Sequence, residues 1–112
     1  MHEQGEILLI PIPFTDLSSN KKRPVIVLSN DNYNSKTNDI IVAAITSNIL
    51  LKEYSVLITN NDLIDGNLKA DSCIRADKIY TLSKNIVIKK FGKVSPDIMF
   101  KLKEKVKDLI DN

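Results

Sequence analysis

The apolar residues of the chain fall into short runs separated by polar segments, a pattern typical of β strands joined by turns. Runs rich in β-branched residues predict strands over residues 24–29, 40–46, 54–59, 72–81 and 86–88. Residues 6–14 are also apolar, but Pro11 and Pro13 lack the backbone N–H that a central strand donates. The second half of that run is therefore expected at a sheet edge or in a turn. Polar residues dominate the segments 15–20, 30–39 and 60–67, which are predicted to be loops.

One helix is predicted at the end of the chain. Ser95 is a good N-cap, Pro96 suits the first helical position, and Asp97 complements the positive end of the helix dipole. Apolar residues then recur at helical spacing and form a face suited to core packing: Ile98, Leu102, Val106, Leu109 and Ile110. Strands do not alternate with helices as they do in a parallel βαβ protein. The pattern predicts a mainly β fold, a small antiparallel barrel packed by a C-terminal helix, in a single domain over residues 1–112.

The composition excludes several classes of protein. The apolar fraction of 43% and the charged fraction of 27% are ordinary for a globular domain. The longest apolar stretches, such as residues 40–45, are far shorter than the ~20 residues that cross a bilayer, and residues 1–4 do not resemble a leader, so we expect a cytoplasmic protein without a membrane partner. A net charge of +2 argues against a protein that coats duplex nucleic acid, although it leaves room for a local phosphate site.

Metal and disulfide chemistry are not expected. Cys73 is the single cysteine and His2 the single histidine, so one chain cannot assemble a zinc site of Cys and His ligands or an internal disulfide. Cys73 is predicted to be a small core residue, and His2 a frayed terminus. We therefore expect no cofactor, and any catalysis should proceed without such a metal.

The two arginines are the most informative charged residues, because fourteen of the sixteen basic residues are lysines. A guanidinium is a planar fork that binds phosphate or carboxylate bidentately, which an ammonium cannot copy. Arg23 follows two lysines at the junction with the strand that begins at Pro24. Arg75 and Asp77, two residues apart in an expected strand, should share one face of the sheet. For each arginine the alternative is a structural ion pair.

Four segments carry a family resemblance in their order along the chain. They are Gly5–Pro11, Lys21–Ser29, the strand end Ile45–Asn48, and Ile74–Asp77 with its Arg-x-Asp pattern. Together with the terminal helix they resemble the MazF/PemK toxins. The resemblance implies an SH3-like barrel of the CcdB and MazF type that forms a homodimer. It also implies metal-independent cleavage of single-stranded RNA at a short sequence, which leaves a 5′-hydroxyl end, and inhibition by a cognate antitoxin with an acidic tail.

The resemblance also implies roles for single residues. Arg23 would clamp the scissile phosphate, and Thr46 would hold the same phosphate from the neighbouring strand end. Arg75 and Asp77 would supply a second cation and a carboxylate base. RNA binding is expected of four polar neighbours: Lys21, Lys22, Ser47 and Asn48. The PemK branch would place a histidine further into the chain, and this sequence departs from that pattern.

Each of these roles has a simpler alternative, and so does the activity. Thr46 could merely end a strand, and Arg75 with Asp77 could form a structural ion pair. A gyrase poison of the CcdB kind would be expected to use a tryptophan near the C-terminus, and this chain has no tryptophan. A catalytically silent RNA-binding barrel of the same fold is the remaining rival, which an activity assay would exclude.

Overall fold

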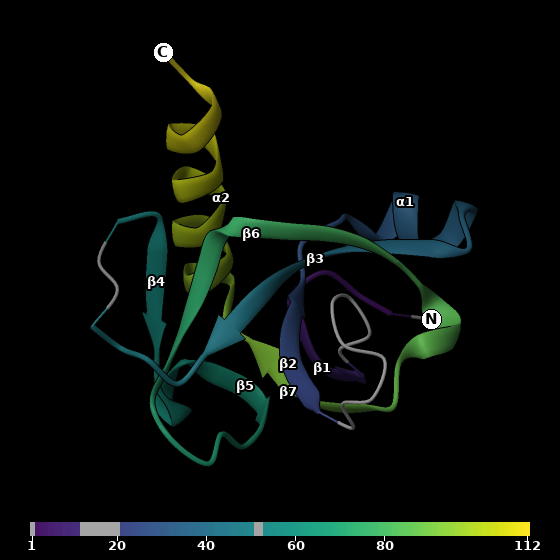
Figure 1. Cartoon of the computed structure of the whole chain (residues 1–112), viewed down its shortest axis with the longest axis horizontal. Coiled ribbons are helices and arrows are strands. Elements are labelled where there is room, and N and C mark those ends of the chain that lie inside the picture. Colours follow the sequence, from purple (N-terminus) through teal and green to yellow (C-terminus); the bar gives the residue numbers. More distant parts are fainter. Residues whose placement is uncertain (1, 12–20, 51–52) are drawn as a thin grey trace.

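The computed structural model describes residues 2–11, 21–50 and 53–112. In this part of the chain seven antiparallel strands form one sheet in the order β4-β6-β3-β2-β1-β7-β5 (Figure 1). The elements are β1 (Glu6–Pro11), β2 (Lys22–Val27), α1 (Asp31–Lys36), β3 (Asp39–Thr46), β4 (Ser55–Ile58), the 3-10 turn η1 (Asn60–Asp62), β5 (Leu63–Gly66), β6 (Ser72–Ser83), η2 (Lys84–Ile86), β7 (Lys89–Val94) and α2 (Pro96–Ile110). The predicted mainly β, antiparallel architecture with a C-terminal helix is confirmed.

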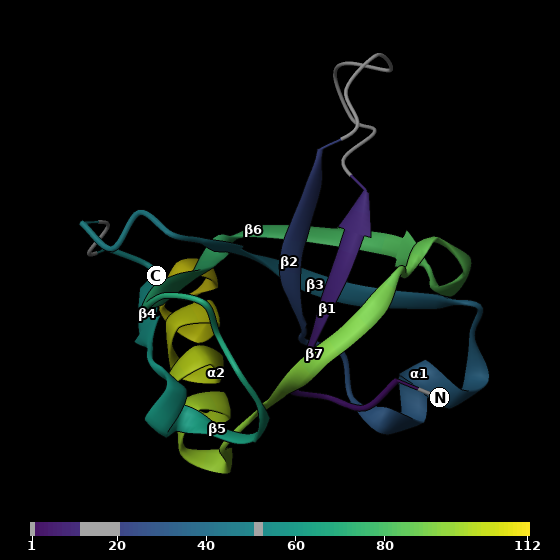
Figure 2. The ribbon, with the colours of Figure 1, turned by 90° about the horizontal axis from the view of Figure 1, so that it is seen from below.

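The sheet is bent into a half-barrel, with the β1–β2 hairpin crossing the direction of β3 and β6 (Figure 2). The bend coincides with an irregularity in the β3–β6 ladder, where Ala43 pairs with Ile79 but the next residue, Ala44, pairs with Arg75. The extra residues 76–78 of β6 form a bulge at this point. A bulge increases the local twist of a strand, which lets β6 serve both halves of the sheet.

The two faces of the sheet carry separate apolar cores. Along β3, Val42 packs into the core formed with β1 and β2, whereas Ala43 packs into the core beneath α2. Because β3 is buried on both faces, its sequence reads as a continuous apolar run, which is why the run was recognisable as a strand. Helix α2 packs against β4 and β6 (Figure 1).

The start of α2 forms as predicted, but its apolar face is only partly buried. The Ser95 hydroxyl accepts a hydrogen bond from the Ile98 N–H at 3.3 Å, and Pro96 opens the helix. Ile98 and Leu102 are buried, whereas Ile110 is 75% exposed because the last turns extend beyond the sheet. Neither helix of the described residues is both long and apolar enough to cross a membrane.

Three predictions about elements are wrong. Residues 30–39 are not all loop, because the Asn30 side chain accepts the Tyr33 N–H at 2.8 Å and starts α1. The strand expected over 86–88 begins later, as β7, and the segment 60–67 contains the short strand β5.

His2 is not frayed, since its carbonyl accepts a hydrogen bond from Asn34 and its Nδ1 lies 3.4 Å from Glu6 Oε1. The polar loop predicted over residues 15–20 lies outside the described residues.

Candidate functional site

Arg23 is the second residue of β2, which begins at Lys22. The sequence had placed it at the junction just before the strand. It is paired with Ile10 of β1 through the backbone, and its side chain is exposed. Within the described part of the chain, the guanidinium makes no hydrogen bond and no ion pair. A structural ion pair, the simpler alternative for this residue, is therefore not what the described residues show.

Thr46 is the last residue of β3, and its hydroxyl has a defined orientation. Thr46 Oγ1 accepts a hydrogen bond from the Asn48 N–H at 3.1 Å, and Asn48 Oδ1 in turn accepts from the Leu50 N–H at 3.1 Å. These bonds form a tight turn at the strand end. Because the Asn48 N–H uses a lone pair of the hydroxyl, the hydroxyl proton remains available to donate to a ligand.

The register places Arg23 and Thr46 on one face of the sheet. Strands β2 and β3 are paired up to Val25 and Ala44, and each candidate residue lies two positions beyond that pair. Side chains two apart in a strand point to the same face. Beyond Val25 the two strands diverge, and β2 continues towards the end of the hairpin (Figure 2). The two side chains therefore lie on the same face at neighbouring strand ends.

Arg75 faces the same side of the sheet, because it pairs with Ala44. Its fork is bound by Asp77, with Nε 3.0 Å from Oδ1 and Nη2 2.6 Å from Oδ2. This hydrogen-bonded pair lowers the pKa of Asp77 and raises that of Arg75. The expectation that the two residues share a face is confirmed. A carboxylate with a lowered pKa is a weak proton acceptor near neutral pH, which disfavours Asp77 as a general base.

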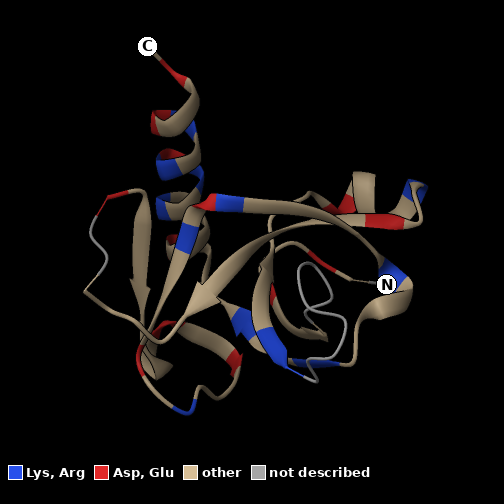
Figure 3. Cartoon of the chain, viewed as in Figure 1, with Lys and Arg blue, Asp and Glu red and all other residues tan. Residues whose placement is uncertain are grey.

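Basic residues gather over the start of β2 and along β7, on the other side of β1 (Figure 3). Much of the β7 charge is compensated: Lys90 lies 3.3 Å from Asp65 and 3.7 Å from Glu6. At the start of β2 both Lys22 and Arg23 are exposed, and neither has an ion-pair partner among the described residues. The uncompensated positive charge therefore lies beside the candidate site.

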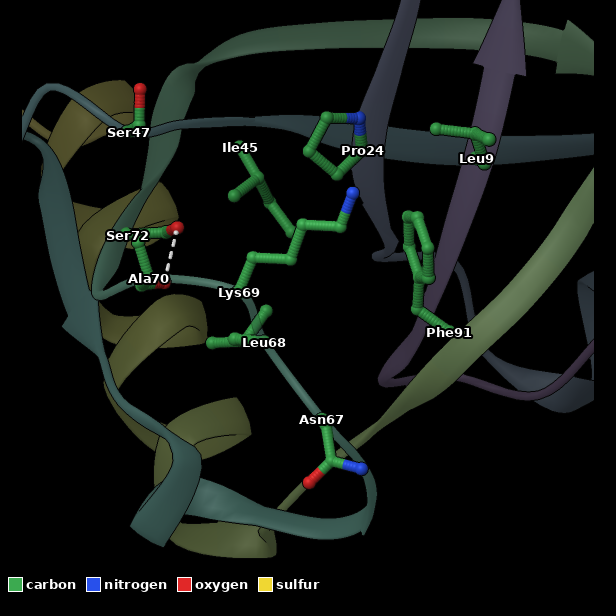
Figure 4. A pocket seen from close by; sticks show the side chains of 10 residues that line it. All are labelled: Leu9, Pro24, Ile45, Ser47, Asn67, Leu68, Lys69, Ala70, Ser72 and Phe91. Carbon is green, nitrogen blue, oxygen red and sulfur yellow. Dashed lines mark hydrogen bonds between the residues drawn. The ribbon is translucent and has the colours of Figure 1, made fainter.

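A cavity of about 230 Å³ lies at the same strand ends. Pro24 and Ile45, the chain neighbours of Arg23 and Thr46, line it together with Leu9, Ser47, Leu68 and Phe91 (Figure 4). Of the four residues predicted to bind RNA, Ser47 is the one that reaches this cavity. Leu68 and Phe91 were missed from the sequence, because neither lies in a segment that carried a recognisable motif.

Metal-ligating and thiol side chains also bear on the chemistry of the site. Among the described residues no three His, Cys, Asp or Glu side chains are grouped as metal ligands would be. Cys73 is buried in β6, and its burial raises the pKa of the thiol. It is a core residue, as predicted, and not a reactive thiolate.

Comparisons with known proteins agree with this architecture. A family described as PemK-like, MazF-like toxins of type II toxin–antitoxin systems matches residues 3–110. No curated protein sequence matches the chain significantly. Among solved structures, a mycobacterial endoribonuclease in complex with its cognate antitoxin superposes with a TM-score of 0.78 at 21% identity, covering 96% of this chain and 93% of the other.

Two other structures are similar over most of their length. The Mycobacterium tuberculosis toxin MazF-mt6 gives a TM-score of 0.73 at 19% identity, with 92% of this chain and 93% of that chain covered. A chain of the MazE–MazF structure from Deinococcus radiodurans gives a TM-score of 0.76 at 16% identity, with 97% of this chain and 94% of that chain covered. At these identities the similarity shows a shared fold.

Proposed function

The chain belongs to the PemK-like, MazF-like toxins of type II toxin–antitoxin systems, and on this premise we propose that it is an endoribonuclease that cleaves single-stranded RNA without a metal ion. Cleavage would occur at a short sequence and leave a 5′-hydroxyl end. The observation that carries the proposal is the position of two groups on one sheet face, at the ends of adjacent strands: the exposed guanidinium of Arg23, which has no partner among the described residues, and the oriented hydroxyl of Thr46.

The proposed reaction uses the RNA itself as nucleophile. The 2′-oxygen loses its proton and forms a bond to phosphorus, while the bond between phosphorus and the 5′-oxygen breaks and that oxygen gains a proton. The products are a 2′,3′-cyclic phosphate and a 5′-hydroxyl. Negative charge grows on the phosphorane between these steps, so the enzyme must place donors and positive charge there.

Arg23 and Thr46 supply these groups. The fork of Arg23 donates two parallel hydrogen bonds to the non-bridging phosphate oxygens and offsets their charge. The Thr46 hydroxyl, which already accepts from Asn48, donates its proton to the same phosphate. Lys21, Lys22 and Asn48 extend the binding surface on either side for the RNA backbone.

Arg75 acts as a second cation that Asp77 orients. The bidentate hydrogen bonds fix the guanidinium plane and keep the carboxylate ionised. Asp77 then supports the site through Arg75 and not as the base that removes the 2′ proton. The pH profile of the cleavage rate identifies the groups that accept and donate the protons.

The proposal includes two partners. A homodimer is supported by the exposed apolar residues that adjoin the site, Ile49 and Leu50 after β3 and Leu57 on the edge strand β4, which a second copy would cover. A cognate antitoxin with an acidic segment is supported by the exposed positive charge of Lys22 and Arg23, which no described acidic residue compensates. Light scattering that shows only a 12.6 kDa species at micromolar concentration would contradict the dimer.

The experiment that tests the function is RNA cleavage by the purified protein in excess EDTA, with Arg23→Ala as the matched control. We expect single-stranded RNA to be cut and the 5′ end of the product to accept phosphate from a polynucleotide kinase without prior phosphatase treatment. Activity that disappears with EDTA and returns with a divalent ion would contradict the metal-independent mechanism. Binding without cleavage would support the silent RNA-binding barrel, and inhibition of gyrase without cleavage would support the CcdB-like alternative.

A further inference from the structure

We propose that the surface beside the start of α2 is a docking site for an acidic segment of a partner protein that carries one large aliphatic side chain. The surface surrounds an open cavity of about 280 Å³, which is lined by residues of β5, the end of β7 and the first two turns of α2. This cavity is separate from the residues proposed to bind and cleave RNA. The inference therefore goes beyond the proposed function.

The floor of the cavity is apolar, and the start of the chain holds it in place. Val94 and Met99 line it and are only 2% and 7% exposed. Gly5, with a φ of +92°, runs across them, since a Cβ added to it would lie 3.4 Å from Met99 Cγ. The Gly5 N–H donates to the Val27 carbonyl at 2.8 Å, and the Gly5 carbonyl accepts from the Val94 N–H at 3.0 Å. The floor therefore exists without a ligand, which lowers the entropic cost of binding.

The side chains above this floor suit an aliphatic group. Ile64 of β5 lines the cavity and is 61% exposed, although it is a large apolar residue. Met99 has a flexible thioether that adapts its shape to a neighbour. An aliphatic side chain inserted between them would remove apolar surface of both partners from water. None of the described residues that line the cavity is aromatic, so it offers no stacking platform for a nucleotide base.

Lysines surround the apolar floor. Lys93 and Lys103 line the cavity, and Lys107 follows one turn later on the same flank of α2, where basic residues recur along the helix (Figure 3). Lys103 and Lys107 are exposed, and neither has an acidic partner among the described residues. Lys93 lies 3.5 Å from the exposed Glu3, in a surface pair that a ligand carboxylate can replace. Positive charge around an apolar floor is complementary to carboxylates that flank an aliphatic side chain.

The docking surface lies at the other end of the β1–β2 hairpin from Arg23. Lys93, at the cavity, pairs with Glu6, the first residue of β1. Arg23 pairs with Ile10, four residues further along that strand, which is a distance of about 13 Å. Figure 2 shows β5 and the first turn of α2 at one end of the molecule and the start of β2 at the other. A segment bound beside α2 would therefore leave Arg23 and Thr46 accessible to RNA.

The test measures the affinity of the full chain for a short synthetic peptide of glutamates with one central leucine. A matched peptide has serine in place of the leucine. We expect the leucine peptide to bind about tenfold more tightly, because its aliphatic side chain is buried in the complex. Amide NMR signals should shift around Ile64, Met99 and Lys103, and those of Lys22 and Arg23 should stay in place. Equal affinities of the two peptides, or shifts centred on Lys22 and Arg23, would overturn the proposal.

Two exposed residues provide variants that locate the contacts. Lys103→Glu should weaken binding of the leucine peptide about fivefold to tenfold, because a carboxylate replaces a cation that faces the charge of the peptide. Ile64→Ser should reduce the preference for leucine over serine, since it removes one wall of the aliphatic contact. Lys101→Glu is the matched control and should bind as the wild type. Lys101 lies on the opposite flank of α2, where it pairs with Asp97 at 3.6 Å. Equal losses in Lys103→Glu and Lys101→Glu would overturn the docking site in favour of unspecific attraction by the net charge.

A single-stranded oligonucleotide whose 2′-deoxy sugars prevent cleavage separates this proposal from the proposed function. The peptide titration is repeated with that oligonucleotide in excess at about 0.15 M salt, where charges more than about 8 Å apart are largely screened. The affinity for the leucine peptide should change less than about threefold. Competition between the two ligands would overturn a separate docking site. A wild type that neither binds nor cleaves RNA would remove the proposed function, whereas the peptide affinities and NMR shifts would still decide this one.

Discussion

The only two arginines of the chain lie on the same face of the sheet in opposite states. Arg23, on β2, is exposed and has no partner among the described residues. Arg75, on β6, has its fork bound by Asp77 through two hydrogen bonds of 3.0 and 2.6 Å. The same type of side chain is thus exposed for a ligand on β2, whereas on β6 it is one member of an ion pair.

The difference shows that environment decides what an arginine can do. A guanidinium that already satisfies a carboxylate gains less from a phosphate, because the new hydrogen bonds replace existing ones. An unpartnered guanidinium exchanges only water for phosphate. If this reasoning is correct, substitutions at Arg23 should reduce cleavage much more than substitutions around Arg75.

The largest effect is expected at Arg23. Arg23→Lys keeps the charge but loses the planar fork, so it should reduce the cleavage rate roughly a hundred- to a thousandfold, about 3–4 kcal/mol, and Arg23→Ala at least as much. Thermal melts should stay close to that of the wild type, since the side chain is exposed. A near-normal rate for Arg23→Lys would rule out the phosphate clamp.

A smaller loss is expected at Thr46. Thr46→Val preserves the shape but removes the hydroxyl, so single-turnover cleavage should slow by roughly 10- to 100-fold, as for loss of one neutral donor to a charged centre. Thr46→Ser is the matched control, because it keeps the hydroxyl that accepts from Asn48. If the serine variant were as slow as the valine variant, the hydroxyl would not be the active group.

Around Arg75 the comparison predicts a graded response. Arg75→Lys should reduce cleavage about tenfold, through loss of an oriented cation, and Asp77→Asn only about threefold, because the guanidinium loses its orientation but keeps its charge. The pH profiles of wild type and Asp77→Asn should have the same shape. A thousandfold loss in Asp77→Asn, with the basic limb of the profile abolished, would instead make Asp77 the general base.

The smallest effect concerns stability and pH. The folded-state pKa of Asp77 is lowered, mainly by its hydrogen bond to Arg75. Its stabilising contribution is therefore present above the unfolded pKa of about 3.9 and is lost as the pH falls through the lowered folded value. Because the pair is partly exposed, Asp77→Asn should lower Tm at pH 7 by at most a few degrees. That difference should shrink as the pH falls below about 3.9 and disappear once the pH is below the lowered folded pKa of Asp77, and a difference that persists there would have another origin.

Much of the fold could be predicted from the sequence because its main signals are local. The apolar run of β3 and the Ser95-Pro96-Asp97 start of α2 were recognisable, since burial on both faces and helix capping depend on adjacent residues. The strand β5 was missed because it is short, polar and held by pairing with β7 across a long sequence separation. The helix α1 was missed because its polar composition resembles a loop, and a single Asn30 cap starts it.

The candidate site, too, could be predicted from the sequence only in part. The sequence alone singled out Arg23 and Arg75 as scarce guanidinium groups, placed Arg75 and Asp77 on one face, and carried the family resemblance that pointed to Thr46. Only the tertiary structure decided that Asp77 binds Arg75 while no described residue binds Arg23. It also decided that Phe91 and Leu68 meet Pro24 across a cavity. Strand register and the close approach of Gly66 to Gly92 bring these groups together from distant parts of the chain. Contacts between such distant residues cannot be predicted from a local sequence pattern.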